Sequence, residues 1–461
     1  MASSSNVTRT GVESAGDIDL QAIDIITPSG QSFSLLGGYI GELNLFEDMY
    51  RSGLYGNLLI IDANNLSQNL NLTGDELISI KMVTPTMDDT LIYKVFKCYA
   101  ITNRQAFTDT GKQSYIIHFA SPEIFLDSLV PLYKTFSGKP DDIVKDIFEN
   151  HLATSRVGDN NFTPLVIVGD ASNQIKFTSP GWRPSKCINW IASKTLSAGY
   201  NAPNYVFYES NKAFYFGNVE QMIDIAKSSN MYYQDYYYVA NNLDGTAASA
   251  SDVSYQKDID FEYKKVEDMH VVETYNSLKS TQNGYLANRL FTFDLVSKTH
   301  DVFDYDHVEN YSAYHHMEDI QGQSLPPFNT NALDSGGALR APGQFNQVYL
   351  KHKTLYTDFT NNASDIIEKI LPPRTATMAE LTNFKIEITV PGRTDIEVGA
   401  LVNFHYPDIS PRDTTDTSKA KDDQLYSGIY LITAVRHKIV LTKHMMILEL
   451  VKDSYRIPTN E

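Results

Sequence analysis

Acidic residues and histidines gather in one short stretch of this 461-residue chain, where their types and spacing could support metal chemistry. Carboxylates and imidazoles close together can hold a divalent metal ion. The members of the stretch are Asp304, Asp306, His307, His315, His316, Glu318 and Asp319. On a helix, neighbours such as His315 and His316 diverge by about 100°. The tyrosines between the members suit a polar interface equally well, so we assign no metal, cofactor or catalytic residue, and leave a metal at 304–319 open.

Motifs for enzymatic catalysis are not found in the sequence. It contains no nucleophile elbow, zinc-binding helix motif or calcium-binding loop. The segment Thr110-Gly111-Lys112-Gln113-Ser114 resembles the end of a phosphate-binding loop, but Ala106 replaces the required earlier glycine and the segment reads as a turn between strands. His118 and His437 fall inside expected strands, where a hydrogen-bonded structural role is the default. We therefore expect a protein that is not an enzyme.

The charge balance argues against a protein that grips nucleic acid. The net charge is −18, from 38 basic and 56 acidic residues, and no basic stripe of the kind that binds phosphate backbones is present. Solubility is a sufficient reason for this charge, although an acidic protein could also repel a DNA strand and let it pass. The 29 tyrosines and 22 phenylalanines favour half-buried strands and protein interfaces.

Three further features bear on the environment of the chain. Cys98 and Cys187 are not paired in a C-x-x-C motif, and we expect buried free thiols in a reducing cytoplasm. No apolar run approaches the ~18 residues that a membrane helix needs. Residues 1–18 are rich in Ser, Gly and Thr, which predicts a flexible arm and not a signal peptide.

The elements that must position any site are mostly strands. From Ala22 to Ser121, short apolar runs alternate with turn signals, which predicts an antiparallel sandwich or barrel. After it, Pro140 to Leu152 shows helical spacing, a second helix is expected after Pro184 with Ser185 as a possible cap, and strands lie around them. This pattern predicts a small α+β domain.

The order of strands and turns in the first part of the chain recurs near its end. Gly53–Asp62 is similar to Gly284–Asp294, and the strands expected at 77–82, 95–102 and 115–119 follow one another like those at 400–405, 429–435 and 445–451. A chance similarity between unrelated hairpins is the alternative. The fold class that we predict is mainly β with α+β insertions: two related antiparallel β-barrels plus a small α+β domain. The division is 1–18 arm, 19–121 first barrel, 122–240 α+β domain, 255–299 with 379–461 second barrel, and 300–378 insertion.

Several of these segments together resemble the central hub proteins of contractile-tailed, T-even-like bacteriophage baseplates. The resemblance lies in the order and the spacing of these segments along the chain, and it covers about Ile23 to Asp453. The segments that carry it are Gly53–Asp62 with Gly74-Asp75-Glu76, Thr178–Pro184 leading to Ile188–Ile191, Tyr205–Glu209, Phe214–Phe216, Gly284–Asp294, Val398-Gly399, Gly428–Tyr430 and Arg436-His437.

The resemblance implies a structural role in the virion tail baseplate, for a protein made in the host bacterial cytoplasm. Such hubs are homotrimers whose two tube-type barrels per chain form a pseudo-sixfold ring, which adapts the sixfold tail tube to the threefold spike. DNA would pass through the lumen without specific binding. Implied partners are a tail tube or tube-initiator protein above, wedge proteins, and a spike below. Because the sequence ends at Glu461 without β-helical repeats, we expect the spike to be a separate protein.

Two other functions stay open at this point. A tail-associated cell-wall hydrolase needs two carboxylates flanking a cleft, and with 56 acidic residues many pairs could meet that requirement. A receptor-binding or carbohydrate-binding tail protein could use the tyrosine-rich run Met231–Tyr238 as a stacking platform. Such a run is also typical of a strand at an interface.

Overall fold

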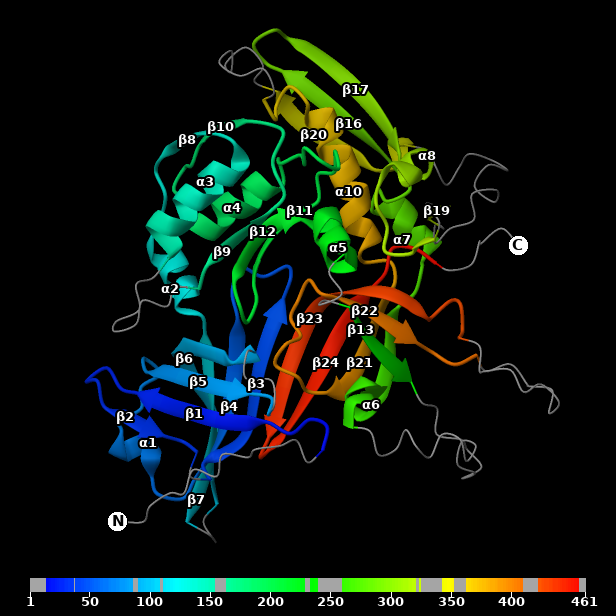
Figure 1. Cartoon of the computed structure of the whole chain (residues 1–461). Coiled ribbons are helices and arrows are strands. Elements are labelled where there is room, and N and C mark those ends of the chain that lie inside the picture. Colours follow the sequence, from blue (N-terminus) through cyan, green and yellow to red (C-terminus); the bar gives the residue numbers. More distant parts are fainter. Residues whose placement is uncertain are drawn as a thin grey trace, which may run out of the picture.

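The computed structural model describes residues 14–36, 38–85, 90–107, 111–153, 163–228, 233–238, 259–320, 323–324, 342–351, 362–408 and 422–455. Their largest element is one sheet of fourteen strands, which extends through two β units that lie side by side (Figure 1). The α+β region and a smaller sheet lie together on one side of these units. Among the described residues, no helix combines the length and the apolar character that crossing a membrane would require.

The first unit contains seven antiparallel strands. They are β1 (Asp19–Ile26), β2 (Ser32–Ser34), β3 (Ile40–Asp48), β4 (Tyr55–Asp62), β5 (Leu77–Val83), β6 (Ile92–Phe107) and β7 (Lys112–Ala120), with the short helix α1 (Leu66–Asn69). Their spatial order is β3-β4-β7-β6-β5-β1-β2. Alternate residues such as Leu58 and Ile60 are fully buried in the core of the unit, as the period of two in a strand requires.

The second unit contributes the other seven strands. They are β13 (Tyr233–Tyr238), β14 (Lys265–Val266), β15 (Asp268–Glu273), β21 (Lys385–Pro391), β22 (Leu401–His405), β23 (Gly428–Val440) and β24 (Lys443–Val451), with α6 (Ile259–Lys264) beside them. β13 runs parallel to β14 and β22, and the remaining pairs are antiparallel. The prediction of a mainly β fold is confirmed. The expected barrels are not closed in the described residues, which form a continuous open sheet instead.

The α+β region follows the first unit in the sequence. It comprises α2 (Pro122–Leu129), β8 (Thr135–Gly138), α3 (Pro140–Ile147), β9 (Leu165–Val168), β10 (Ile175–Thr178), α4 (Pro184–Ala192), β11 (Tyr205–Glu209), β12 (Phe214–Asn218) and α5 (Val219–Ser228). The capping role suggested for Ser185 is wrong. Arg183 is the N-cap of α4 and Pro184 is its first residue, because proline fits a position that has no intrahelical N–H partner. Ser185 instead donates its backbone N–H and its hydroxyl to Asp127.

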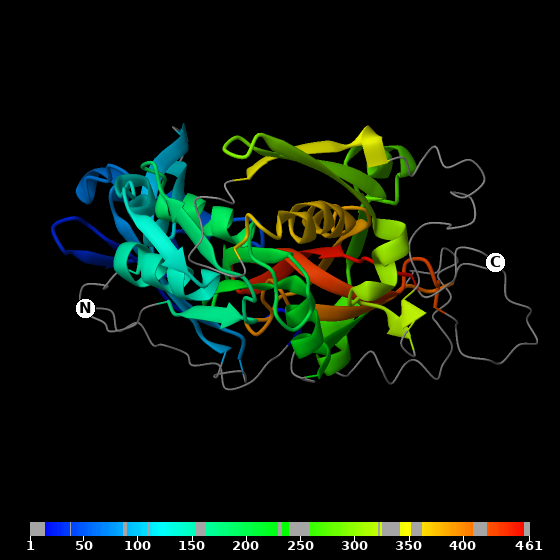
Figure 2. The same ribbon diagram turned by 90° about the horizontal axis from the view of Figure 1, so that it is seen from above.

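A separate three-stranded sheet lies between the two parts of the second unit in sequence. It contains β16 (Ala287–Asp294), β17 (Thr299–Asp306) and β20 (Asn346–Lys351), and α7 (Ser277–Gln282), α8 (His307–Asn310) and α10 (Leu371–Glu380) lie near it (Figure 2). The predicted match of Gly284–Asp294 to Gly53–Asp62 is therefore wrong, because β16 belongs to this sheet. The buried side chain of Leu290 in β16 packs with the core of the α+β region and not with the second unit.

Candidate assembly interface

The two β units join where β3 of the first unit pairs with β23 of the second. The pairing is antiparallel, with Asp48 opposite Ala434 and Leu43 opposite Ile439 (Figure 1). Leu43, Leu45 and Ile439 are fully buried on the core side. The two strands are almost 400 residues apart in sequence, so no local signal could have predicted that they pair.

A buried polar contact secures this junction. His437 Nε2 lies 3.1 Å from Glu47 Oε1, and His437 Nδ1 lies 3.0 Å from His444 Nε2. All three side chains are excluded from solvent. Burial, with the neighbouring His437 as a smaller cause, holds the pKa of His444 well below its usual value. A neutral His444 therefore lies beside His437, and the structural role expected for His437 is confirmed.

The opposite face of the junction is polar and internally paired. Arg436 Nε donates to Asn44 Oδ1 at 2.9 Å, and the Arg436 guanidinium lies 3.4 Å from Glu42. Lys438 Nζ lies 3.7 Å from the other oxygen of Glu42. Asn44 also donates to Asn57 Oδ1 on β4 at 2.9 Å. Both basic side chains on this stretch of β23 thus have an acidic neighbour on β3.

The two units repeat one strand order. In chain order the equivalent strands are β1, β3, β4, β5, β6, β7 and β13, β15, β21, β22, β23, β24. If the six strands of a unit are numbered one to six along the chain, they lie side by side in the sheet in the order one, four, five, six, three, two, and this order is the same in both units. The pairings from the fourth strand onward are antiparallel in both. The first and fourth strands pair antiparallel in unit one and parallel in unit two.

The equivalence extends to the register of individual residues. In each unit the fifth strand skips one residue against the sixth, at Tyr99 in β6 and at Thr433 in β23. Counting from these bulges, Leu77–Ile80 in β5 matches Leu401–Phe404 in β22, as the sequence predicted. The true equivalent of β4 is β21, and β16 has no counterpart in the first unit.

The predicted acidic and histidine cluster is dispersed by the fold. Asp304 forms an ion pair with Arg289, at 2.5 and 2.8 Å. Asp306 caps α8 by accepting the N–H groups of Val308 and Glu309. These two carboxylates are therefore engaged in separate local contacts.

Two histidines of the cluster, His307 and His316, contact the two oxygens of Glu380, whereas His315 lies apart from them. His315 is half-exposed and lies 3.3 Å from Asp224, whereas His307 is buried with Nε2 3.3 Å from Glu380. His316 is buried, with Nδ1 3.2 Å from Asp453. Burial alone would lower the pKa of His316, but the hydrogen bond to Asp453 and the charge of Glu380 raise it to about 9.

Glu318 completes the described part of the cluster. It accepts the backbone N–H of Ile429 at 2.6 Å, and its own N–H donates to Ser454. The position of Asp319 side-chain atoms lies outside the described residues. Within the described part of the chain, no group of three His, Cys, Asp or Glu residues is arranged to hold a metal. The stretch instead fixes the end of the second unit to the small sheet.

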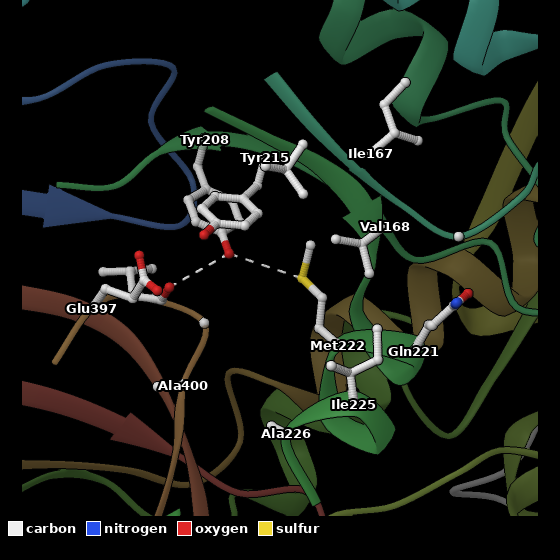
Figure 3. A pocket seen from close by; sticks show the side chains of 14 residues that line it. Ile167, Val168, Tyr208, Tyr215, Gln221, Met222, Ile225, Ala226, Glu397 and Ala400 are labelled. Carbon is white, nitrogen blue, oxygen red and sulfur yellow. Dashed lines mark hydrogen bonds between the residues drawn. The ribbon is translucent and has the colours of Figure 1, made fainter. Parts of the chain in front are cut away.

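A cavity lies between the α+β region and the second unit (Figure 3). Its volume is about 470 Å³, and β9, β12, α5 and the segment before β22 line it. Glu397 is the one carboxylate among the described lining residues. It accepts hydrogen bonds from Ser210 at 2.8 Å and Lys212 at 3.0 Å. The lining therefore does not offer the two opposed carboxylates that glycoside hydrolysis requires.

A second hollow of about 320 Å³ is more polar. Glu123 and Asp127 of α2 line it together with Arg51 and Arg183. Asp127 uses both oxygens to hold the start of α4, at 2.6 and 2.7 Å from Ser185 atoms. Because the two carboxylates lie four residues apart on one helix, they share one wall and do not flank a cleft.

The tyrosine-rich run forms strand β13, within the described residues 233–238. Tyr236 is fully buried in the core of the second unit. The Tyr237 ring stacks on His405 with centroids 4.5 Å apart, and Tyr238 stacks on Tyr406 at 5.2 Å. These rings pack against the neighbouring strand, as the strand interpretation predicted.

No family model and no curated protein sequence matches the chain. Over nearly its full length the chain is structurally similar to phage tail proteins. A tail protein from Neisseria meningitidis is 10% identical over 94% of this chain and 96% of its own, with a TM-score of 0.47. The 43 kDa tail protein of prophage MuSo2 from Shewanella oneidensis is 7% identical over 95% and 100%, with a TM-score of 0.48. A type VI secretion component from E. coli, described as structurally similar to tail proteins of bacteriophage T4, is 7% identical over 96% and 79%, with a TM-score of 0.39.

Proposed function

We propose that this chain is a structural subunit of the central hub in a contractile phage-tail baseplate, and that three copies form a ring. The observation that carries the proposal is the repeated strand order within one chain. Two equivalent units already share a sheet through the β3·β23 junction. Three chains with two such units each would present six similar units around an axis, which suits an adaptor between a sixfold tube and a threefold spike.

In this proposal the repeated units are the two tube-type domains. Residues 19–121 form the first, and 255–299 with 379–461 supply the second, from which the strand at 287–294 is now removed. Strand β13 (Tyr233–Tyr238) falls inside the predicted α+β domain of 122–240 but pairs with β22, so it belongs to the second unit. The rest of 122–240 and the insertion of 300–378 would face the spike or the wedge proteins. A tail tube or tube-initiator protein would bind the opposite end of the ring, and DNA would pass through the lumen without specific binding.

The polar face of the junction between β3 and β23 supports the proposal that DNA passes through the lumen without binding to it. Arg436 and Lys438 both lie against Glu42, so one of their two positive charges is offset within the sheet. The chain as a whole carries a net charge of −18, which repels a phosphate backbone. If this face lines the lumen, DNA meets few uncompensated cations there.

The mass in solution tests the ring. Light scattering of the purified full-length chain should give three times the chain mass of 51.8 kDa. The equilibrium should shift towards smaller species on dilution and return on concentration. A mass of one chain at every protein concentration, or a stable dimer, would contradict the proposal.

A further inference from the structure

Two strand edges in this chain are equivalent to the two sides of the β3·β23 junction, and no strand of the described residues pairs with either of them. We propose that β15 of one chain pairs antiparallel with residues 100–107 of β6 in a second copy, which repeats between chains the junction seen within one. This inference rests on the proposed function and names the interface that would close the ring.

The first open edge is β15, the equivalent of β3. Both are the second strand of their unit, and both pair through one edge with the third strand, β21 or β4. Following these registers, His270 occupies the position of Asn44 and Met269 that of Leu43. In the described residues no strand pairs with the other edge of β15.

The second edge belongs to residues 100–107 of β6, which lie beyond the part of the strand that pairs with β5. They are equivalent to the part of β23 that pairs with β3. β5 pairs with β6 only from Ile92 to Lys97, just as β22 pairs with β23 only up to Leu431. Beyond that point β23 pairs with β3, whereas in the described residues no strand pairs with the same edge of residues 100–106, whose other edge pairs with β7. Counting along β7 and β24 places Gln105 at the position of Lys438 and Ala106 at that of Ile439.

The irregularities of the two edges match each other. β15 carries one extra residue between Val271 and Glu273. β6 carries an irregularity between Thr102 and Gln105, where one residue more than in β23 is inserted. Placed by equivalence, Glu273 faces Thr102. His270 then faces Gln105, three residues earlier on β15 and three residues later on β6. The two insertions therefore oppose each other, and the pairing continues in register to Asp268 opposite Phe107.

Side chains at both edges are more exposed to solvent than the side chains of the internal junction. Leu43, Leu45 and Ile439 are 0% exposed, but Val271 and Val272 are 36% and 45% exposed on β15. Residues 102–107 of β6 are all exposed. A long strand edge with apolar side chains is a liability in a free protein, and pairing with another strand removes it.

The charges of the two edges are opposite in sign. Glu267 and Asp268 are exposed at the start of β15. Glu273 at the end of the strand already has a cation beside it, Lys279 Nζ at 2.5 Å. Arg104 and Lys112 are exposed on the β6–β7 hairpin. Opposite charges favour the correct partner and register over edge pairing of like with like. A β15-to-β6 contact is head to tail, and it forms a closed ring only if the rotation from chain to chain completes a circle.

Disulfide trapping between separately labelled chains tests this interface. Directly opposed residues of an antiparallel pair have Cβ atoms about 4.5–5.5 Å apart, near enough for a disulfide after a small adjustment. His270→Cys and Gln105→Cys are made as single variants, mixed, and oxidised mildly. Cys98 and Cys187 are buried and should stay silent. We expect a covalent dimer from the mixture and none from either variant alone, whereas His270→Cys mixed with Val348→Cys on the small sheet should not cross-link.

Controls separate the interface from the ring itself. Asn44→Cys combined with Lys438→Cys in one chain, the equivalent pair at the internal junction, should close a disulfide without added mass. If light scattering shows a trimer but the mixture does not cross-link above the Val348 control, the edge pairing is wrong and the ring stands. If every variant and the wild type remain single chains, both proposals fail. A further variant, Val271→Lys with Val272→Lys, replaces two exposed side chains of β15 and should reduce the mass to one chain with an unchanged melting curve. A trimer that persists would overturn the interface.

Discussion

Loss of Lys94 should destabilise the chain strongly, because it leaves a buried carboxylate without its cation. Lys94 Nζ on β6 lies 2.9 Å from Glu209 Oε1 on β11, and the two side chains are 5% and 1% exposed. The other Glu209 oxygen accepts the N–H of Leu54 at 3.1 Å and the hydroxyl of Ser121. This pair therefore holds the α+β region against the first unit.

The expected loss in the free energy of unfolding depends on whether a variant leaves Glu209 buried and charged without its cation. Removal of one partner of a buried ion pair costs about 3–5 kcal/mol. Because Glu209 keeps two other donors, we expect Lys94→Met to lower the free energy of unfolding by about 3 kcal/mol. Lys94→Met with Glu209→Gln should lose only about 1–2 kcal/mol, because no charge is then left buried.

Urea unfolding monitored by fluorescence measures this difference. The chain has 2 tryptophans, Trp182 and Trp190, and both lie in the α+β region next to the core that contains β11. Lys97→Met is the matched control, because its ion pair with Asp75 is largely exposed and should be worth less than about 1 kcal/mol. If Lys94→Met costs no more than Lys97→Met, or if the double variant is the less stable of the two Lys94 variants, the reasoning is refuted.

Three further outcomes follow. Gly56→Ala should cost more than about 1 kcal/mol in urea unfolding, since a Cβ there would lie 2.3 Å from the Phe119 ring, whereas Gly199→Ala, with open space around it, should be near neutral. Burial raises the pKa of Glu220 to about 8, so protonation of the folded state stabilises the chain at low pH and this stability is lost as pH rises from about 4.5 through 8. Glu220→Gln should flatten that loss, and a parallel pH profile would contradict it. Purified protein should not clear peptidoglycan; lysis that one Asp or Glu substitution abolishes would show an enzyme.

The sequence predicted the local elements better than their partners. Strands β5, β6, β7 and β22, β23, β24 could be matched in order because each triplet follows a turn signal and keeps its alternation of apolar residues. β16 was misassigned for the same reason. Its apolar pattern fits any half-buried strand, and only the packing of Leu290 into the α+β core determines which sheet it joins.

The candidate interface could be predicted only in part. The resemblance and the strand order indicated two similar units, but the contact between β3 and β23 depends on residues such as Glu47 and His437 that meet only after folding. The cluster of acidic residues and histidines from Asp304 to Asp319 was prominent in the sequence because closeness in sequence does not show where each side chain points. In the fold, His315 and His316 contact different elements, and each carboxylate that the structure describes already has a local partner.

The central claim is that three chains form a ring of six similar units. Electron cryomicroscopy of the assembled protein, viewed along its axis, tests this most directly. We predict a threefold axis and six sheet units that alternate between residues 19–121 and the second unit. Strand β15 should lie beside β6 of the next chain. A particle without threefold symmetry, or one in which the two units of a chain occupy unrelated positions about the axis, would contradict it.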